Sequence, residues 1–174
     1  MRVILQVLNF TILALFLSSF TVVTPYIYSK LANAPVYVDP QFRPHLEQFK
    51  TDAKRYGVKL NLFKLITVFS NKVNSGTAAY CLPHSNIVVV STRSWEGLNE
   101  QGKKALLYHE WGHCILRREH VEAEHSFPTY CPISVMYPYI DPMNRCYNSL
   151  EESYNRELFT NPYNFKLFSR SKKK

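Results

Sequence analysis

Two histidines and a glutamate in this sequence are spaced as a metal site requires. His109, Glu110 and His113 form the pattern H-E-x-x-H within the run HEWGH. Residues four apart project from the same face of a helix, so the two imidazoles can converge on one cation. The carboxylate beside the first histidine can then reach a water molecule bound to that cation. The pattern therefore predicts metal-assisted hydrolysis, with Glu110 as the general base.

A third protein ligand must complete such a site. A catalytic zinc ion normally takes three protein ligands and leaves its fourth position to water. Because imidazole suits zinc, we favour His120, which follows His113 by seven residues. Glu119 is the nearest competitor. Further candidates lie close by in the sequence or on a later predicted helix: Glu122, Glu124, His125, Glu151 and Glu152.

The histidine pair needs a helix to carry it, and the sequence predicts one from about Asn99 to Leu116. Small and apolar residues recur there at three- and four-residue steps, and both histidines fall on the same stripe. The helix is therefore predicted by periodicity, independently of the metal motif. The stripe consists of Ala105, Leu106, His109, Gly112, His113 and Leu116.

Other elements are predicted before and after this helix. An amphipathic helix is expected over 39–57, because apolar residues recur at helical steps between a capping aspartate and a glycine. The β-branched and aromatic residues of 58–70 predict a strand, and 77–82 with 87–91 predict a hairpin. A short final helix is expected over 150–158.

The four cysteines predict two disulfides and an oxidising compartment. Cys131 and Cys146 flank a loop that contains three prolines, so we favour this local pair. Elimination then pairs Cys81 with Cys114, and the second bridge would join the hairpin to the histidine helix.

Composition and charge limit the class of protein. The 174 residues are 46% hydrophobic with only 5 glycines, which predicts one folded domain and excludes a disordered or collagen-like chain. The formal net charge of +8 favours contact with an anionic envelope polymer or membrane surface. We expect no specific nucleic-acid partner and a monomeric protein.

The first segment predicts export. Residues 3–23 are almost wholly apolar, which is typical of a secretory signal or of a single membrane anchor. We expect residues 1–34 to form this signal or anchor, 35–168 the folded domain, and 169–174 a basic tail. The domain would then be periplasmic, secreted or anchored to the membrane by residues 3–23.

The motifs together resemble a known group of enzymes. The run HEWGH, the nearby His120 and the later run 134–137, with the sequence SVMY, resemble the metzincin clan of zinc peptidases. That clan has the signature H-E-x-x-H-x-x-G-x-x-H and a later methionine turn. Residues 77–139 are also similar to a family of small exported bacterial zinc peptidases. In the clan signature, Leu116 holds the place of the glycine and Glu119 that of the third histidine, so Glu119 stays open as a ligand.

The resemblance implies a fold and an activity. It implies an α+β zincin-like domain, with a small mixed sheet packed on the active-site helix and Met136 beneath the zinc ion. It also implies hydrolysis of peptide or protein substrates, with the substrate paired to an edge strand, either 87–91 or its hairpin partner. Alternatives are a catalytically inactive zinc-binding protein and an envelope-binding protein.

Overall fold

The computed structural model describes most of the predicted domain. The predicted signal or anchor within 1–34 and the predicted tail 169–174 lie outside the described residues. Within the described part of the chain, no helix is long and apolar enough to cross a membrane. The described residues are 35, 37–82, 84–123 and 130–160.

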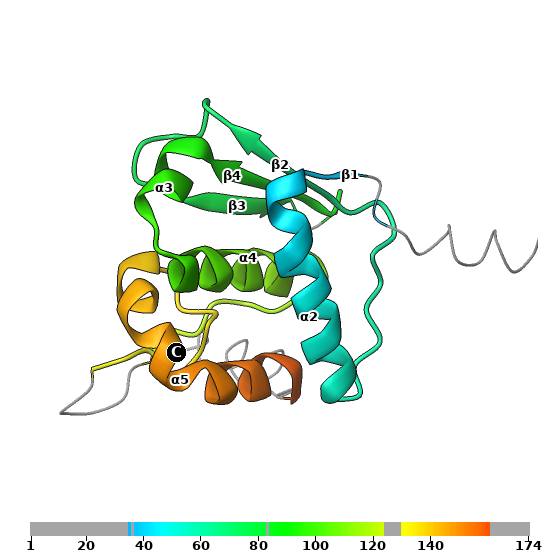
Figure 1. Ribbon diagram of the computed structural model, residues 1–174, viewed down its shortest axis with the longest axis vertical. Coiled ribbons are helices and arrows are strands. Elements are labelled where there is room, and N and C mark those ends of the chain that lie inside the picture. Colours follow the sequence, from blue (N-terminus) through cyan, green and yellow to red (C-terminus); the bar gives the residue numbers. More distant parts are fainter. Residues whose placement is uncertain (1–34, 36, 83, 124–129, 161–174) are drawn as a thin grey trace, which may run out of the picture. The chain divides into compact units, whose positions relative to one another are not determined.

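One small mixed sheet forms a layer of the domain (Figure 1). Its strands are β1 (Tyr37–Val38), β2 (Ile66–Ser70), β3 (Ala79–Leu82) and β4 (Ile87–Ser91). They lie in the order β1-β2-β4-β3, with β1, β2 and β4 parallel and β3 antiparallel to β4. The predicted mixed sheet and the predicted hairpin are confirmed. Strand β3 forms an edge of the sheet, whereas β4 lies between two neighbours.

The predicted strand over 58–70 is correct only in its last part, because β2 begins at Ile66. The residue pairing of β2 begins at Ile66, opposite Tyr37 of β1 and Ile87 of β4. Leu62 and Leu65 are nevertheless buried in the core. The apolar alternation of this segment therefore reflects a loop packed on the core, not a longer strand.

The helices confirm two predictions and correct a third. Helices α2 and α4 match the segments expected over 39–57 and from Asn99 to Leu116, but the final helix is 21 residues long instead of a short one over 150–158. Its proline, Pro142, lies in the first turn, where a missing N–H breaks no helical hydrogen bond. The helical elements are η1 (Pro40–Phe42), α2 (Arg43–Arg55), α3 (Thr92–Gly97), α4 (Glu100–Cys114) and α5 (Ile140–Thr160).

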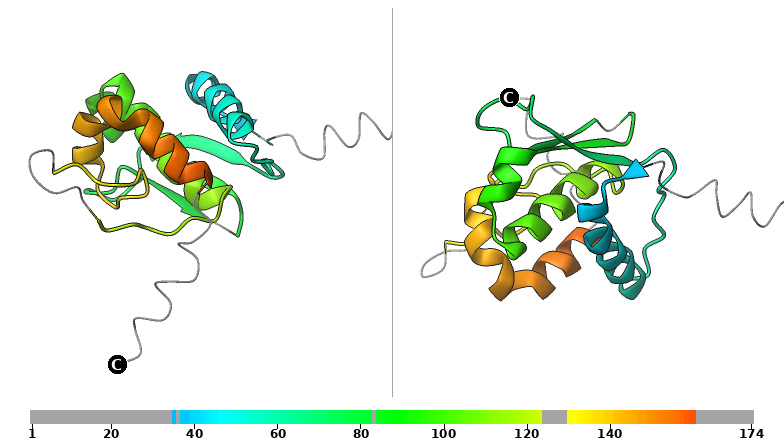
Figure 2. Two further views of the ribbon diagram at one scale, coloured as in Figure 1. Left: turned by 90° about the horizontal axis from the view of Figure 1, so that it is seen from below. Right: turned by 45° about the horizontal axis from the view of Figure 1, so that its top comes forward.

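Helix α4 lies at the centre of the fold. The sheet packs on one side of it and α5 on the other, while α2 crosses beside it (Figures 1 and 2). Two glycines allow close approach: a Cβ on Gly102 would lie 2.2 Å from Asn144 Oδ1, and one on Gly112 would lie 2.5 Å from Met136 Sδ. Asn99 caps the helix by accepting a hydrogen bond from the Gly102 N–H at 2.8 Å.

A buried polar network joins α2, α4 and α5. The Asp52 carboxylate accepts hydrogen bonds from Tyr108 Oη at 2.6 Å, Gln48 Nε2 at 3.1 Å and Asn155 Nδ2 at 3.4 Å. Tyr147 donates to Asn155 Oδ1 at 3.2 Å, which extends the network along α5. Because each of these groups has a partner, the network adds stability and specificity to the packing of three helices.

Candidate metal centre

Three imidazoles meet at the end of helix α4. His109 and His113 come from the helix and His120 from the segment that follows it. The Nε2 atom of His109 lies 3.0 Å from that of His113 and 3.2 Å from that of His120. Nitrogen ligands at about 2.0–2.1 Å from a tetrahedral zinc ion lie about 3.3 Å apart. The three side chains can therefore hold one metal ion, and their nitrogens fit an ion that binds as zinc does.

Backbone carbonyls set the orientation of two of these rings. His109 Nδ1 lies 2.9 Å from the Val135 carbonyl oxygen, and His113 Nδ1 lies 2.6 Å from that of Arg118. A carbonyl can only accept, so each Nδ1 is the donor. In the neutral ring, Nε2 then presents its lone pair to the shared point between the histidines.

The surroundings favour neutral imidazoles. Burial, and to a smaller extent the neighbouring His113, lower the pKa of His109 to about 3. Burial is also the main cause that lowers the pKa of His113 and that of His120. A ring that binds a metal must be deprotonated at the ligating nitrogen, so the site is prepared for a cation at neutral pH.

The end of helix α4 explains why His120 joins this group. Arg117 adopts a left-handed backbone conformation, with φ of 58°, and the Arg118 N–H donates to the Gly112 carbonyl at 3.0 Å. In the clan signature, the glycine comes three residues after the second histidine, and the third histidine three residues later. Here the left-handed residue comes four after His113, and His120 again follows it by three. Measured against that signature, the left-handed residue comes one position later, and His120 lies at the signature's three-residue distance from it.

The competing ligands do not join the three histidines. Glu119 and Glu122 are exposed and outside the group. On α5, Glu151 pairs with Lys104 at 2.6 Å, and Glu152 pairs with Arg55 at 2.9 Å. Two further sequence candidates, Glu124 and His125, lie outside the described residues.

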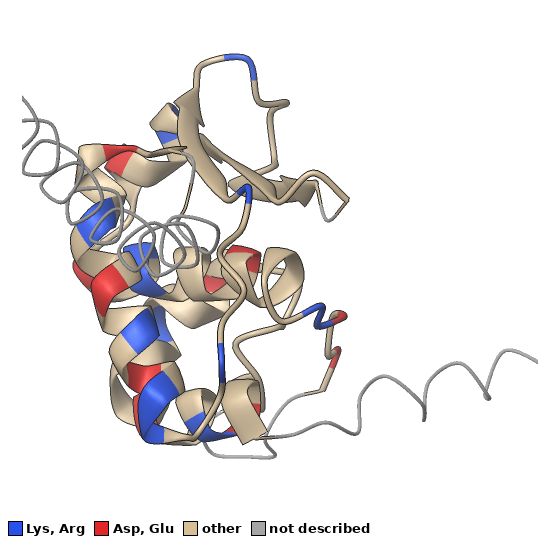
Figure 3. Ribbon diagram, turned by 90° about the vertical axis from the view of Figure 1, so that its right-hand side faces the viewer, with Lys and Arg blue, Asp and Glu red and all other residues tan. Residues whose placement is uncertain are grey.

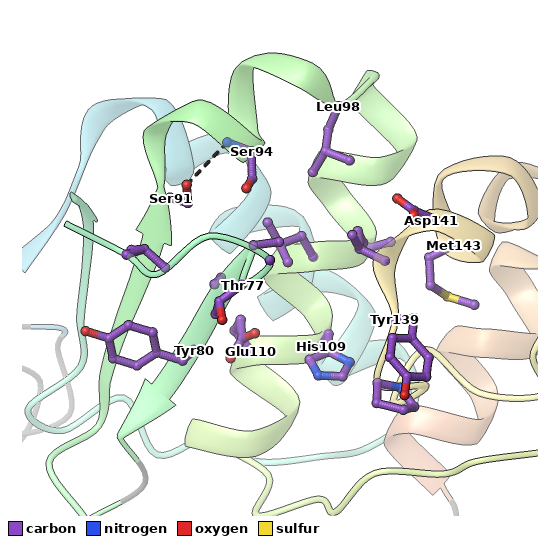
Figure 4. Close-up of a pocket in the computed structure, with 18 of the residues that line it drawn as sticks. Thr77, Tyr80, Ser91, Ser94, Leu98, His109, Glu110, Tyr139, Asp141 and Met143 are labelled. Carbon is purple, nitrogen blue, oxygen red and sulfur yellow. Dashed lines mark hydrogen bonds between the residues drawn. The ribbon is translucent and has the colours of Figure 1, made fainter. Parts of the chain in front are cut away.

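Glu110 lies beside the histidines but is not one of the group. Its side chain is buried, and Oε2 has no hydrogen-bond partner among the described residues. Burial raises the pKa of Glu110 to about 8. Figure 4 shows Glu110 and His109 next to each other on α4, with Tyr80 to one side and Tyr139 to the other. Glu110 thus lines an open cleft as a buried carboxylate, with one oxygen unpartnered among the described residues.

Met136 packs against the helix turn that carries both histidines. Its side chain is fully buried and contacts the position of Gly112, which lies directly before His113. The Met136 N–H donates to Ser134 Oγ at 3.0 Å, and the Tyr137 N–H donates to the Ser134 carbonyl at 3.2 Å. These bonds form a tight turn that holds Met136 against α4.

An open cleft of about 1190 Å³ contains the three histidines and Glu110. Strand β3 and the preceding residues 71–78 line one side of it, and residues 137–141 line the other. Of the two strands expected to offer a free edge, 87–91 is wrong, because β4 is paired on both sides. The free edge belongs to its hairpin partner, β3, which lines the cleft.

Both predicted disulfides are confirmed. Cys81 pairs with Cys114, and Cys131 pairs with Cys146. The first joins β3 to α4 one residue after His113, so it ties one wall of the cleft to the histidine helix. The two disulfides indicate an oxidising compartment.

Comparison with family models, with curated proteins and with solved structures found no match for the chain. The structure itself shows an α+β architecture with a small mixed sheet. Because no match was found, the metzincin-like relationship stays a prediction.

Proposed function

We propose that this protein is a zinc-dependent peptidase that acts outside the cytoplasm. One observation carries the proposal: three imidazole Nε2 atoms, spaced to share an ion, line an open cleft beside a buried carboxylate. One oxygen of that carboxylate has no partner in the described part of the chain. A cleft lined by the edge strand β3 of a mixed sheet and by the histidine helix is compatible with a zincin-like fold. The apolar segment 3–23 and the disulfides support export.

The residues would divide the chemistry between them. His109, His113 and His120 would hold the zinc ion, which when bound supplies a Lewis acid for the scissile carbonyl and for water. Glu110 would take a proton from the attacking water and pass it to the leaving amine. Strand β3 would pair its free backbone groups with an extended peptide, and we expect a monomer to suffice for this.

The surface charge gives less support to an envelope-binding function. Figure 3 shows acidic and basic residues interspersed along the helices, with few charged residues on the strands. Several of the basic groups are also paired, as in Lys50–Glu47 and Lys103–Glu100. An anionic polymer binds best to a continuous basic surface. The net charge of +8 alone therefore gives little support to envelope binding.

The decisive experiment measures zinc and peptide cleavage on the same sample. The disulfide-bonded protein is analysed for zinc, treated with a chelator, reloaded, and incubated with a peptide library. We expect about one zinc per chain, with cleavage that is lost with the metal and recovered with it. Bound zinc without cleavage would instead show a binding protein, and a chain that takes up no metal would rule out the proposal.

A further inference from the structure

Glu157 lies near the end of α5, and its two carboxylate oxygens contact two separate loops. Oε1 accepts a hydrogen bond from Nη2 of Arg118, and Oε2 accepts one from Ser134 Oγ at 2.5 Å. The side chains of Glu157 and Arg118 are largely buried, at 17% and 8% exposed. A charged pair removed from water in this way holds its partners in a narrow range of positions.

The same two loops provide the carbonyls that orient the histidines. The Arg118 carbonyl accepts from His113 Nδ1 at 2.6 Å, and the carbonyl next to Ser134, that of Val135, accepts from His109 Nδ1 at 2.9 Å. Glu157 is therefore connected to each ring through one loop. The Arg118 route runs from Glu157 through Arg118 to His113, and the Val135 route runs from Glu157 through Ser134 and its neighbour Val135 to His109.

Further hydrogen bonds make each route rigid. Arg118 Nη1 donates to the Glu157 and Leu158 carbonyls at 3.1 and 2.8 Å, and so satisfies acceptors that the end of α5 leaves without helical partners. The Ser134 hydroxyl donates to Glu157 and accepts from the Met136 N–H. The Val121 N–H donates to the Met136 carbonyl at 3.0 Å, which joins one loop to the other.

We propose that Glu157 is a positioning residue of the metal centre. Its carboxylate fixes the two loops at the places where their carbonyls set the tautomer and direction of the His109 and His113 rings. The consequence for metal affinity rests on the proposed function, whereas the consequence for the rings is a property of the metal-free protein. The alternative is that Glu157 forms an ordinary buried ion pair that only stabilises the fold.

The test compares Glu157→Gln with Glu151→Gln. Glu151 is a matched control, because it lies on the same helix and pairs with Lys104 of α4, but contacts neither loop. Zinc affinity is measured by competition with a chromophoric chelator, and the visible spectrum is recorded after Co²⁺ loading. Groups that orient metal ligands typically contribute about 10–100-fold to affinity. We expect a loss of this size and an altered Co²⁺ spectrum for Glu157→Gln, and a change below about 2-fold for Glu151→Gln.

A metal-free measurement separates this inference from the proposed function. Long-range ¹H–¹⁵N spectra of the imidazoles report which nitrogen carries the proton. In the parent protein we expect protonated Nδ1 on His109 and His113, and in Glu157→Gln a mixture of tautomers. If the tautomers stay as in the parent, the positioning role is wrong, even if the variant is less stable. If the parent protein binds no zinc, the proposed function fails, while the tautomers still decide the role of Glu157.

Ser134→Ala keeps the test valid if Glu157→Gln does not fold. This change removes the hydroxyl between Glu157 and the Met136 N–H but leaves the Arg118 pair in place. We expect the tautomer of His109 to change more than that of His113, because only the Val135 route is broken. Equal changes in both rings, or none, would overturn the two-route arrangement.

Discussion

Asp52 of helix α2 and Glu110 of helix α4 are both buried carboxylates, and they differ in what surrounds them. Asp52 is 7% exposed and accepts hydrogen bonds from three side chains, the shortest from Tyr108 at 2.6 Å. Glu110 is 4% exposed, and its Oε2 has no partner among the described residues. Asp52 faces α4 and α5, whereas Glu110 lines the cleft.

The difference separates an acid that stabilises the fold from one that can do chemistry. Burying a carboxylate is unfavourable unless hydrogen bonds offset the lost hydration. The bonds to Asp52 provide this compensation. Burial, together with its own bond to Asp52, raises the pKa of the Tyr108 hydroxyl above its usual range. The Oε2 atom of Glu110 has no such hydrogen bond among the described residues, and burial raises the pKa of Glu110 to about 8. Such an uncompensated acid in a cleft is typical of a functional site.

The largest expected effect concerns the acid in the cleft. Glu110→Gln removes the proton acceptor but keeps the shape of the side chain. We expect turnover to fall about 10²–10⁴-fold, the usual contribution of general acid–base catalysis, with zinc content unchanged. The free energy of unfolding should not decrease, because a neutral amide replaces an acid that burial disfavours. Activity assays with zinc analysis and urea unfolding test this, and an active variant would reassign the base.

The acid of the structural network should behave in the opposite way. Asp52→Ala leaves the Tyr108 hydroxyl and the Asn155 amide buried without their acceptor, so we expect a loss of about 3 kcal/mol in unfolding free energy. Zinc affinity of the folded protein should stay within about 2-fold, because none of the hydrogen bonds of this network involves a histidine ring. A large loss of zinc affinity at unchanged stability would contradict the division between the two regions.

The third ligand provides a direct comparison within the cleft region. His120→Ala should weaken zinc binding more than about 100-fold, since outer groups alone contribute about 10–100-fold. Glu119→Ala should change it less than about 2-fold, because that side chain is exposed and outside the histidine group. Chelator competition measures the zinc affinity of both variants. A larger loss of affinity in Glu119→Ala than in His120→Ala would identify Glu119 as the third ligand.

The smallest effect is expected where α4 meets Met136. In Gly112→Ala the new Cβ would lie 2.5 Å from Met136 Sδ, so the methionine must move. We expect about 2 kcal/mol of destabilisation from this overpacking, together with weaker zinc binding. Gly97→Ala is the matched control, because a Cβ there meets nothing within 4 Å. Equal stabilities of the two variants would show that Met136 adapts without strain.

Local features of the sequence predicted the elements and part of the site. The stripe that carries His109 and His113 follows from the helical repeat, and the helix begins beside Asn99, close to the predicted start. The pairing of Cys131 with Cys146 follows from their closeness in the sequence. These predictions succeeded because each depends on residues that are near one another along the chain.

Other parts of the site depended on contacts that local patterns do not encode. The clan spacing kept Glu119 open, and only the left-handed turn at Arg117 brings His120 into the group. The carbonyls that orient the histidines carry no side-chain signal, and Glu157 lies 37 residues after His120. Helix α5 is longer than the predicted helix over 150–158, because Pro142 lies in its first turn, where proline does not end a helix.

The sequence by itself determined which groups could bind a metal and on which helix two of them lie, because imidazole chemistry and the 3.6-residue repeat are local properties. The tertiary structure decided which third group joins them, which strand offers a free edge, and which carbonyls hold the rings. Those outcomes depend on how far-apart segments pack against α4, and packing is a property of the whole domain.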